Sequence, residues 1–272
     1  MLPHSAYRAF LVLFVLFCLS TVFPAEEEPQ LTADQQRQFL LTAEVIKSKQ
    51  IDQGVTRSYR LTLSDGTMQH YAHFQSINER RSRKELSRGV EINFVDSYLY
   101  NIAAYELARM LGLDDMVPVT VERKWNGKTG SLAWWLPTLM TEGERKERNI
   151  RPPDIAAWNK SMYKVRVFTE LIYDTDRSNP GNMLIGKNWE LYMVDFTRAF
   201  RLYYDLPDSK NLVLCSRDLF EKLRALDASE LEARTGKYLN ELERKGIMQR
   251  RDKIVDFFEK RIAEKGEAAV LY

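Results

Sequence analysis

The sequence has very little cysteine. Cys18 lies in an apolar stretch near the N-terminus, and Cys215 is the single cysteine of residues 26–272. An internal disulfide is therefore excluded for that part of the chain. Neither a histidine nor an acidic residue adjoins Cys215, so we interpret it as a buried small hydrophobic residue rather than a nucleophile.

Net charge is also nearly absent. Residues 26–272 contain 39 Lys and Arg against 38 Asp and Glu, a net charge of +1, because Arg8 is the only such residue before them. Binding of nucleic acid usually requires a basic surface, so we expect no nucleic-acid partner. The sequence has no internal repeat, and its length suits one large domain or two lobes.

The N-terminus has the pattern of a bacterial export signal. Arg8 precedes an apolar run, Phe10–Phe23, and Pro24-Ala25 then gives way to three glutamates. The run is shorter than the roughly 20 residues of a spanning helix. We predict that residues 1–25 are a signal peptide, or an uncleaved anchor for membrane attachment, because the bulky Phe23 disfavours cleavage. The basic charge ahead of the run predicts that the domain lies outside the cytoplasm.

The sequence between residues 44 and 136 predicts a five-stranded antiparallel sheet with one inserted helix. Apolar or alternating runs indicate the strands, and Asp65-Gly66 and Asn126-Gly127 are typical of tight turns. Residues 97–111 have apolar positions at helical spacing and end at Gly112, which predicts the helix. Thr32 opens a further short helix. The predicted strands are 44–49, 59–63, 68–77, 117–123 and 130–136.

The rest of the chain is predominantly helical in pattern. The charge-dense segment 78–88 is either a solvated loop or a basic lip beside a phosphate site, and residues 141–151 predict a polar linker and lid. The order of elements predicts an α+β fold, with residues 26–140 as a small lobe, residues 141–272 as a larger helical lobe, and a cleft between them. Helices are predicted from Ile155, over 164–173, and near 217–226, 229–239 and 242–264.

Residues 174–198 concentrate the groups that phosphate chemistry needs. Asn182 follows Asp176 by six residues, and a short apolar strand ends on Asp195. Phosphoryl transfer requires a clamped nucleotide, a divalent metal held by oxygen ligands, and a carboxylate that orients the attacking hydroxyl. We therefore predict Asp176 as catalytic acid/base and Asn182 and Asp195 as metal ligands. The competing interpretation is that these are ordinary turn and capping residues.

The same segment carries a resemblance to known proteins. Residues 174–185 and 194–196 resemble the catalytic and metal loops of atypical kinases of the HipA-like and phosphoinositide-kinase-like groups. Residues 40–272 also resemble an uncharacterised bacterial family of kinase-like proteins. The phrases that match this family include Asp96-Ser97-Tyr98, Leu111-Gly112-Leu113, Val117-Pro118 and Arg198-Ala199-Phe200-Arg201.

This resemblance implies a bilobal kinase-like fold with ATP between the lobes and Mg²⁺ on Asn182 and Asp195. It implies Asp176 as the catalytic acid/base, and Arg177 as the residue whose guanidinium braces the catalytic loop. The partners that it implies are a nucleotide and an acceptor, either a protein or a small hydroxyl compound. The nucleotide contacts that it implies are Gly54, His73, Gln75, Leu136 and Met140.

Three features depart from the kinase pattern. Asp176 and Asn182 are six residues apart where kinases usually have five, so one intervening residue must bulge out. Gln75 occupies the place of the lysine that faces the phosphates, and Asn101 occupies the place of its acidic partner. The loop around Gly54 has one glycine where phosphate-covering loops often have three.

These departures leave different classes of function open. One is a kinase-like phosphotransferase. Another is an exported pseudokinase, a binding module of the cell envelope without catalysis, which the scarcity of ATP outside the bacterial cytoplasm favours. Transfer of a nucleotidyl group is a third alternative.

Overall fold

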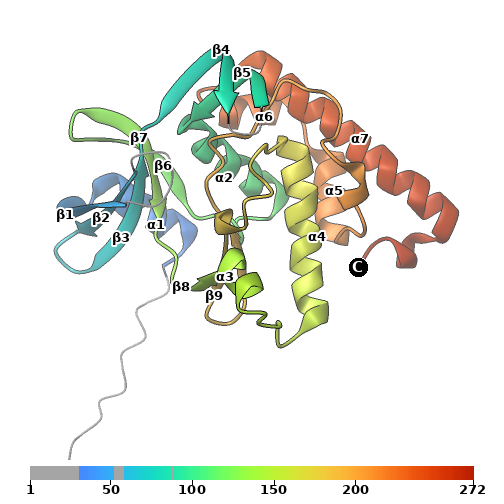
Figure 1. The fold of residues 1–272 in the computed structure, drawn as a ribbon, viewed down its shortest axis with the longest axis horizontal. Helices are drawn as coiled ribbons and strands as arrows, with labels where there is room; N and C mark the ends of the chain where they lie inside the picture. Colours follow the sequence, from blue (N-terminus) through green and yellow to red (C-terminus); the bar gives the residue numbers. More distant parts are fainter. Residues whose placement is uncertain (1–30, 52–57, 87–88) are drawn as a thin grey trace, which may run out of the picture. The chain divides into compact units, whose positions relative to one another are not determined.

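Antiparallel strands build the first half of the fold. The computed structural model describes residues 31–51, 58–86 and 89–272, so the predicted leader and Gly54 lie outside the described residues (Figure 1). One sheet has the strand order β1-β2-β3-β7-β6, with every neighbouring pair antiparallel. The predicted α+β fold with its five-stranded sheet is confirmed. The strands are β1 (Glu44–Ile51), β2 (Ser58–Ser64), β3 (Gln69–Gln75), β6 (Thr120–Trp125) and β7 (Lys128–Trp134).

Helices form most of the second half. The α-helices of the described residues are α1 (Ala33–Thr42), α2 (Leu99–Leu111), α3 (Glu142–Glu147), α4 (Ile155–Ile172), α5 (Arg217–Ala225), α6 (Ala228–Thr235) and α7 (Glu241–Lys265). Helix α2 contacts β6 and β7 on one side and α5 and α6 on the other, so it joins the sheet to the helical part. Among the described residues, no helix has the length and apolar character needed to cross a membrane.

Helix α1 packs against β6 and β7 on one face of the five-stranded sheet. The ring of Phe39 meets Trp134 of β7 edge-on, with 5.7 Å between ring centroids. Arg123 of β6 donates to the backbone carbonyls of Leu40 and Ala43, each at 2.6 Å, and so satisfies acceptors at the end of the helix. Strand side chains alternate between faces. The opposite face of the sheet is therefore the one that meets α2 and the helical part.

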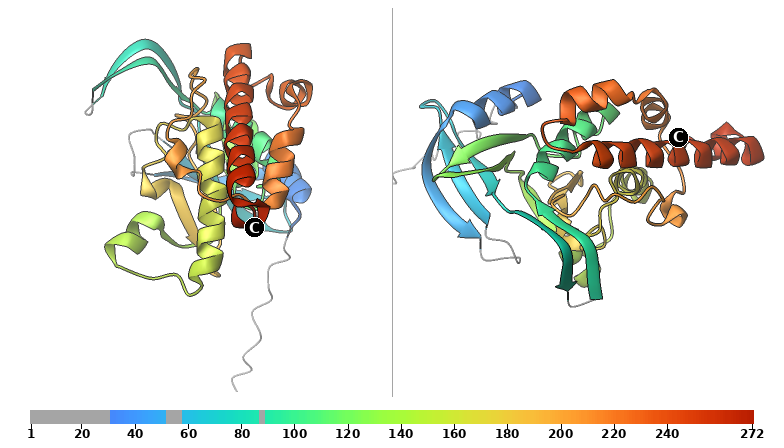
Figure 2. Two further views of the ribbon diagram at one scale, coloured as in Figure 1. Left: turned by 90° about the vertical axis from the view of Figure 1, so that its right-hand side faces the viewer. Right: turned by 90° about the horizontal axis from the view of Figure 1, so that it is seen from above.

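Residues 78–86 of the charge-dense segment 78–88 form a strand, so the solvated-loop alternative was wrong, whereas the basic-lip alternative stays a prediction. β4 (Asn78–Leu86) pairs with β5 (Gly89–Ser97) in a two-stranded ribbon that projects from the fold (Figure 2). Opposite charges compensate one another along the ribbon: Glu79 lies 2.8 Å from Lys84 and 2.5 Å from Arg81. Such pairs allow a charged sequence to form a strand with solvent on one face.

Two further predictions, one of a linker and one of two separate helices, were also wrong. Segment 141–151 was predicted as a linker and lid, but it contains α3, which opens with a capping box between Thr141 and Glu144. The helices predicted from Ile155 and over 164–173 are one continuous helix, α4. No glycine or proline interrupts residues 155–172, so nothing in the sequence ends the helix early.

The last strand of a small three-stranded sheet ends just before Asp195. The sheet has the order β10-β9-β8, and its strands are β8 (Thr138–Thr141), β9 (Met183–Gly186) and β10 (Leu191–Met193). Beyond the last paired strand residues, Val194 N donates to the backbone oxygen of Asn182 at 3.0 Å. This bond holds the chain just before Asp195 against the loop that carries Asn182. The lobe boundary predicted at residue 140 stays a prediction, since residues 32–272 form one compact unit.

Candidate functional site

The loop between α4 and β9 folds around Asp176. Its backbone N–H donates to Asp174 Oδ1 at 2.9 Å, and its backbone oxygen accepts from Asn179 N at 2.9 Å. Its side-chain Oδ2 accepts from Asn179 Nδ2 at 3.0 Å and from Asn182 Nδ2 at 3.1 Å. The structure therefore brings Asp176 and Asn182, both singled out from the sequence, into direct contact.

A turn of 3₁₀-helix, η1 (Pro180–Asn182), accommodates the extra residue of this loop. The side chain of Asn179 accepts from Gly181 N at 3.0 Å, and its backbone oxygen accepts from Asn182 N at 3.1 Å. The tight i→i+3 bonding of such a turn shortens the path of the chain. Asn182 consequently returns to Asp176 despite the six-residue spacing.

Asp195 follows β10 with a left-handed backbone, φ 58°. A non-glycine residue in this region carries strain of the kind that often accumulates at functional sites. Its Oδ1 accepts from the Thr197 hydroxyl at 3.0 Å. Burial raises the pKa of Asp195, and the charge of Asp176 acts in the same direction, while the Thr197 and Gln75 side chains oppose the shift. Asp195 thus lies within electrostatic range of Asp176 and next to Gln75.

Two more carboxyl groups lie close to these residues. Burial raises the pKa of Asp174 to about 7, and the charges of Asp176 and Asp195 add to the effect. Burial and the charge of Asp195 also raise the pKa of Asp96, at the end of β5. The Oδ1 atom of Asp96 is buried and has no hydrogen-bond partner among the described residues. The sequence interpretation gave Asp96 no role, although it stands directly before the predicted helix.

Asp96, Asp174 and Asp176 each lie within electrostatic range of Asp195, and these four residues, the carboxyl cluster, would attract a cation. Asp174 is buried and the other three residues are half-buried. Like charges held close together destabilise one another, and a cation relieves that repulsion. The unpartnered oxygen of Asp96 and the amide oxygen of Asn182 are hard ligands of the type that Mg²⁺ and Mn²⁺ accept. Within the described ranges, no three His, Cys, Asp or Glu side chains are already arranged around one metal position. A metal here would therefore also need oxygens from a ligand.

The opposite side of the site is neutral. Asn101 Nδ2, on α2, donates to Gln75 Oε1 at 2.9 Å and to Ser131 Oγ at 3.2 Å. Asn101 Oδ1 in turn accepts from Phe196 N at 2.8 Å. Gln75 and Asn101 are buried, with 3% and 8% of their surface exposed. The two residues expected in place of a lysine and its acid do meet, but as an uncharged amide pair.

The other predicted nucleotide contacts lie on or near the sheet. His73 precedes Gln75 on the same face of β3, and burial lowers its pKa to about 4, so it is neutral at neutral pH. Across the strand pair, Arg60 opposes His73 and places its guanidinium 4.7 Å from the ring centre of Tyr71. Met140 of β8 is buried and Leu136 is half-buried. Roles for His73, Leu136 and Met140 in binding a nucleotide stay predictions.

Two arginine side chains stabilise the acidic loop, residues 174–182, and the segments next to it. Arg177 Nε lies 4.0 Å from Glu170 Oε1, which is fully buried in α4. Arg250 of α7 is also fully buried, and its guanidinium donates to the backbone oxygens of Leu171, Arg201 and Tyr203. It thereby connects the end of α4 to the segment after Asp195. The sequence analysis missed Arg250, because nothing in a charged helical sequence distinguishes a buried arginine from an exposed one.

The fold is similar to solved kinase structures. No protein-family model matches the chain, and no curated protein matches its sequence. A structure of hydra Fam20 with sugar aligns with a TM-score of 0.62 and 15% identity, covering 88% of this chain and 92% of that one.

Two structures of kinases show the same likeness. The Golgi casein kinase with Mn and ADP bound aligns with a TM-score of 0.58 and 14% identity, covering 88% of this chain and 78% of that one. The Helicobacter pylori proinflammatory kinase CtkA aligns with a TM-score of 0.50 and 11% identity, covering 83% of this chain and 97% of that one. The chain therefore has an atypical kinase-like fold, as its sequence predicted.

Proposed function

We propose that this protein is an atypical kinase, a phosphotransferase that uses a metal-bound nucleotide held between the acidic loop and the sheet. Asp176 is the catalytic acid/base, and Asn182 and Asp195 are metal ligands, with Asp96 as a further ligand. The observation that carries this proposal is the meeting of Asp176 Oδ2 and Asn182 Nδ2 at 3.1 Å in a region where Asp195 adds a third polar group.

The side chains can support in-line phosphoryl transfer. Asp176 orients the acceptor hydroxyl and takes its proton as the new oxygen–phosphorus bond forms and the bond to the nucleoside diphosphate breaks. The amides of Asn179 and Asn182 fix the orientation of the Asp176 carboxylate. A divalent cation, when bound, neutralises charge on the transferred phosphoryl group.

The expected nucleotide is ATP with Mg²⁺ or Mn²⁺. A structural neighbour, the Golgi casein kinase, was solved with Mn and ADP, which supports this choice. We place the nucleotide against the sheet face that carries His73 and Gln75, with Leu136 and Met140 near its base. Arg177 keeps its predicted role, because its contact with buried Glu170 braces the loop. The relation to HipA-like kinases and the export of the protein through its leader belong to the same proposal.

Thermal melting with and without nucleotide tests the proposal. ADP or ATP with Mn²⁺ or Mg²⁺ is expected to raise the Tm of the full chain, since a ligand that binds only the folded state stabilises it. Asp195→Ala should abolish the shift. Asp205→Ala is the matched control, because the Asp205 side chain is 90% exposed and contacts only the exposed Lys253 in the ion pairs found. Absence of any shift in the unaltered protein would refute the proposal.

The alternative is a pseudokinase that binds an envelope partner without transferring phosphate. The neutral contact between Gln75 and Asn101 favours it, because the sheet side offers no charge to the phosphates at that point. Incubation with γ-labelled ATP separates the two functions. Label on the protein itself or on an acceptor, lost in Asp176→Asn, supports the kinase. A metal-dependent Tm shift without any transfer supports the pseudokinase.

A further inference from the structure

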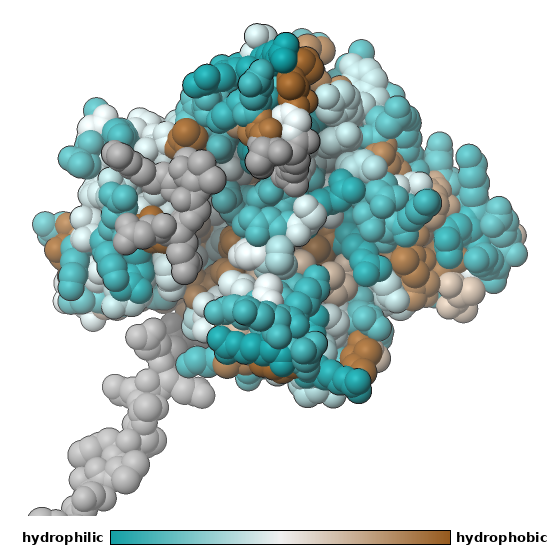
Figure 3. Space-filling view, viewed as in Figure 1, coloured by the Kyte–Doolittle hydropathy of each residue, from teal (hydrophilic) through white to brown (hydrophobic). Residues whose placement is uncertain are grey.

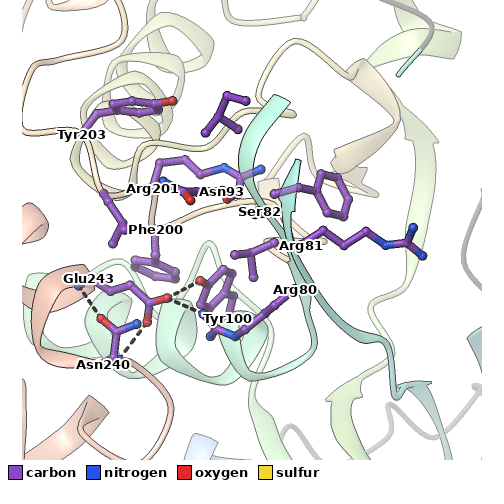
Figure 4. A pocket seen from close by; sticks show the side chains of 14 residues that line it. Arg80, Arg81, Ser82, Asn93, Tyr100, Phe200, Arg201, Tyr203, Asn240 and Glu243 are labelled. Atoms are coloured by element: carbon purple, nitrogen blue, oxygen red, sulfur yellow. Dashed lines mark hydrogen bonds and ion pairs between the residues drawn. The ribbon is translucent and has the colours of Figure 1, made fainter. Parts of the chain in front are cut away.

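A second candidate site lies beside the proposed phosphate site. A cavity of about 330 Å³ opens between the β4–β5 ribbon, the segment Phe200–Tyr203 and the first turn of α7 (Figure 4). Its volume is at the lower end of the range of small-molecule pockets. The residues that line it include none of the carboxyl cluster and neither Asn182 nor Gln75. It is therefore separate from the site proposed for the nucleotide.

The floor of the cavity holds a buried acid that is fully compensated. Tyr100 Oη donates to Glu243 Oε1 at 2.5 Å, and Arg80 Nη1 donates to the same oxygen at 3.1 Å (Figure 4). Glu243 Oε2 accepts from Asn240 N at 2.8 Å, as part of the cap of α7. Because both oxygens of Glu243 are already engaged, its charge presents little repulsion to an anion entering the cavity.

Three arginines line the cavity, and each of them has an acidic partner. Arg80 pairs with Glu243, Arg81 with Glu79 and Arg201 with Glu91. Arg201 is the decisive group, since it is only 4% exposed. It donates to Asn93 O and to Glu91, but its Nε is buried and has no partner among the described residues. A buried, incompletely satisfied guanidinium is costly, and an anion in the cavity would supply the missing acceptor.

The rim of the cavity is apolar. Ile92, Leu202 and Tyr203 line it and are 55%, 40% and 52% exposed. Figure 3 shows hydrophobic and hydrophilic residues next to one another over the β4–β5 ribbon. Exposed apolar groups that surround a polar floor favour a ligand with a small aromatic or aliphatic body and an anionic head.

We propose that this cavity is a regulatory site for a small anionic ligand with an aromatic or aliphatic body. Arg201 binds the anionic head, and Ile92 and Tyr203 contact the body. The ligand can influence the phosphate site because Arg201 and Arg198 both bind Glu91, and Thr197 is joined to Ser97 through the backbone at 3.0 Å. An anion that draws Arg201 away from Glu91 disturbs the segment that presents Asp195. The regulatory half of the proposal rests on the proposed function, whereas binding in the cavity does not.

Calorimetric titration with phenyl phosphate tests binding. The full chain and its Asp195→Ala variant, which lacks the proposed nucleotide site, should bind phenyl phosphate equally, and about tenfold more tightly than phenol or inorganic phosphate. Ser82 lines the cavity, so Ser82→Trp should fill it and abolish binding. Arg83→Trp is the control, because Arg83 is the next residue of the ribbon, is 63% exposed and does not line the cavity.

Several results would overturn the inference. If neither phenyl phosphate nor benzoate binds, or if Ser82→Trp binds as well as Arg83→Trp, the cavity is not the site. Binding of an acidic, aromatic peptide without binding of phenyl phosphate would replace the small ligand with a protein partner. For regulation, saturating phenyl phosphate should change the affinity for ADP and Mn²⁺ by about fivefold or more. An unchanged ADP affinity refutes regulation, whereas failure of ADP to bind at all refutes only the proposed function.

Discussion

The acidic side of the candidate site presents the carboxyl cluster, whereas the sheet side, formed by Gln75 of β3 and Asn101 of α2, presents amides. On the acidic side, burial and, more weakly, mutual repulsion raise the pKa of Asp174 and Asp195. On the sheet side, Gln75 and Asn101 satisfy each other without any charge. The proposed function therefore assigns the attraction for a phosphate group to a bound metal rather than to a lysine at position 75, which makes metal dependence the most informative property to measure.

Asp176 is the central residue of the acidic side, and its substitution should have the largest effect. Asp176→Asn retains an oxygen that can accept from Asn179 and Asn182 but cannot take a proton from the acceptor. We expect phosphate transfer to fall about 10³-fold, a loss of about 4 kcal/mol in transition-state stabilisation, with nucleotide affinity little changed. Single-turnover transfer assays and calorimetry measure the two effects. Full biological activity of a folded Asp176→Asn protein would contradict catalysis and favour the pseudokinase.

Substitution of Arg250, which connects the segments next to the acidic side, should lower the free energy of unfolding of the protein. Arg250→Met leaves three backbone oxygens, those of Leu171, Arg201 and Tyr203, without this donor, and the bonds to the first two are buried. We expect the free energy of unfolding to fall by about 3 kcal/mol, as determined by urea denaturation. Lys253→Met on the same helix should change it by less than about 1 kcal/mol, since its contact with Asp205 is exposed. An equal effect of the two substitutions would show that Arg250 is not a specific support.

The sheet side can be given the charge that it lacks. Gln75→Lys combined with Asn101→Glu replaces the amide contact with an ion pair next to Asp195. We expect the double variant to bind ATP with Mg²⁺ about tenfold more tightly, with an interaction of roughly 1–2 kcal/mol between the two substitutions. Gln69→Lys, at the exposed end of the same face of β3, is the control. Weaker binding by the double variant than by either single variant would show that the amide pair is adapted to the ligand.

The repulsion on the acidic side should also appear as pH dependence. The pKa of Asp174 is about 7 in the folded state and near 3.8 when unfolded, so the folded state holds a proton that the unfolded state releases between these values. The bound proton therefore stabilises the folded state at low pH, and this contribution to the free energy of unfolding is lost as the pH rises through 7. Asp174→Asn should therefore be the more stable protein above pH 7, by about 1 kcal/mol or more, and similar to the unaltered protein near pH 4. If the free energy of unfolding depends on pH in the same way for the two proteins, the raised pKa of Asp174 is contradicted.

Most elements of the fold could be predicted because their signals are local. Alternation of side chains and the turns at Asp65-Gly66 and Asn126-Gly127 identified all five strands of the main sheet, and Gly112 marked the end of α2. The β4–β5 ribbon was missed because its charged residues match the composition of a loop. Only side-chain contacts in the folded protein, such as that between Glu79 and Lys84 of β4, show how the charges are compensated.

The candidate site was only partly predictable. Asp176, Asn182 and Asp195 stood out because their types and order match a known chemical task. Asp96 and Arg250 did not, because an acid before a helix and an arginine within a helix are common on protein surfaces. Their importance comes from burial and from neighbours distant in sequence, neither of which a single sequence displays.

The sequence by itself determined most of the strands and helices, and it put glutamine and asparagine where its resemblance to kinases predicts a lysine and an acid. These properties depend on each residue and its neighbours along the chain. Only the tertiary structure decided that Asp96 lies within electrostatic range of Asp195, that Gln75 and Asn101 bond to each other, and that an arginine-lined cavity forms beside them. Charge proximity and burial are properties of packing, and packing joins segments that are far apart in the sequence.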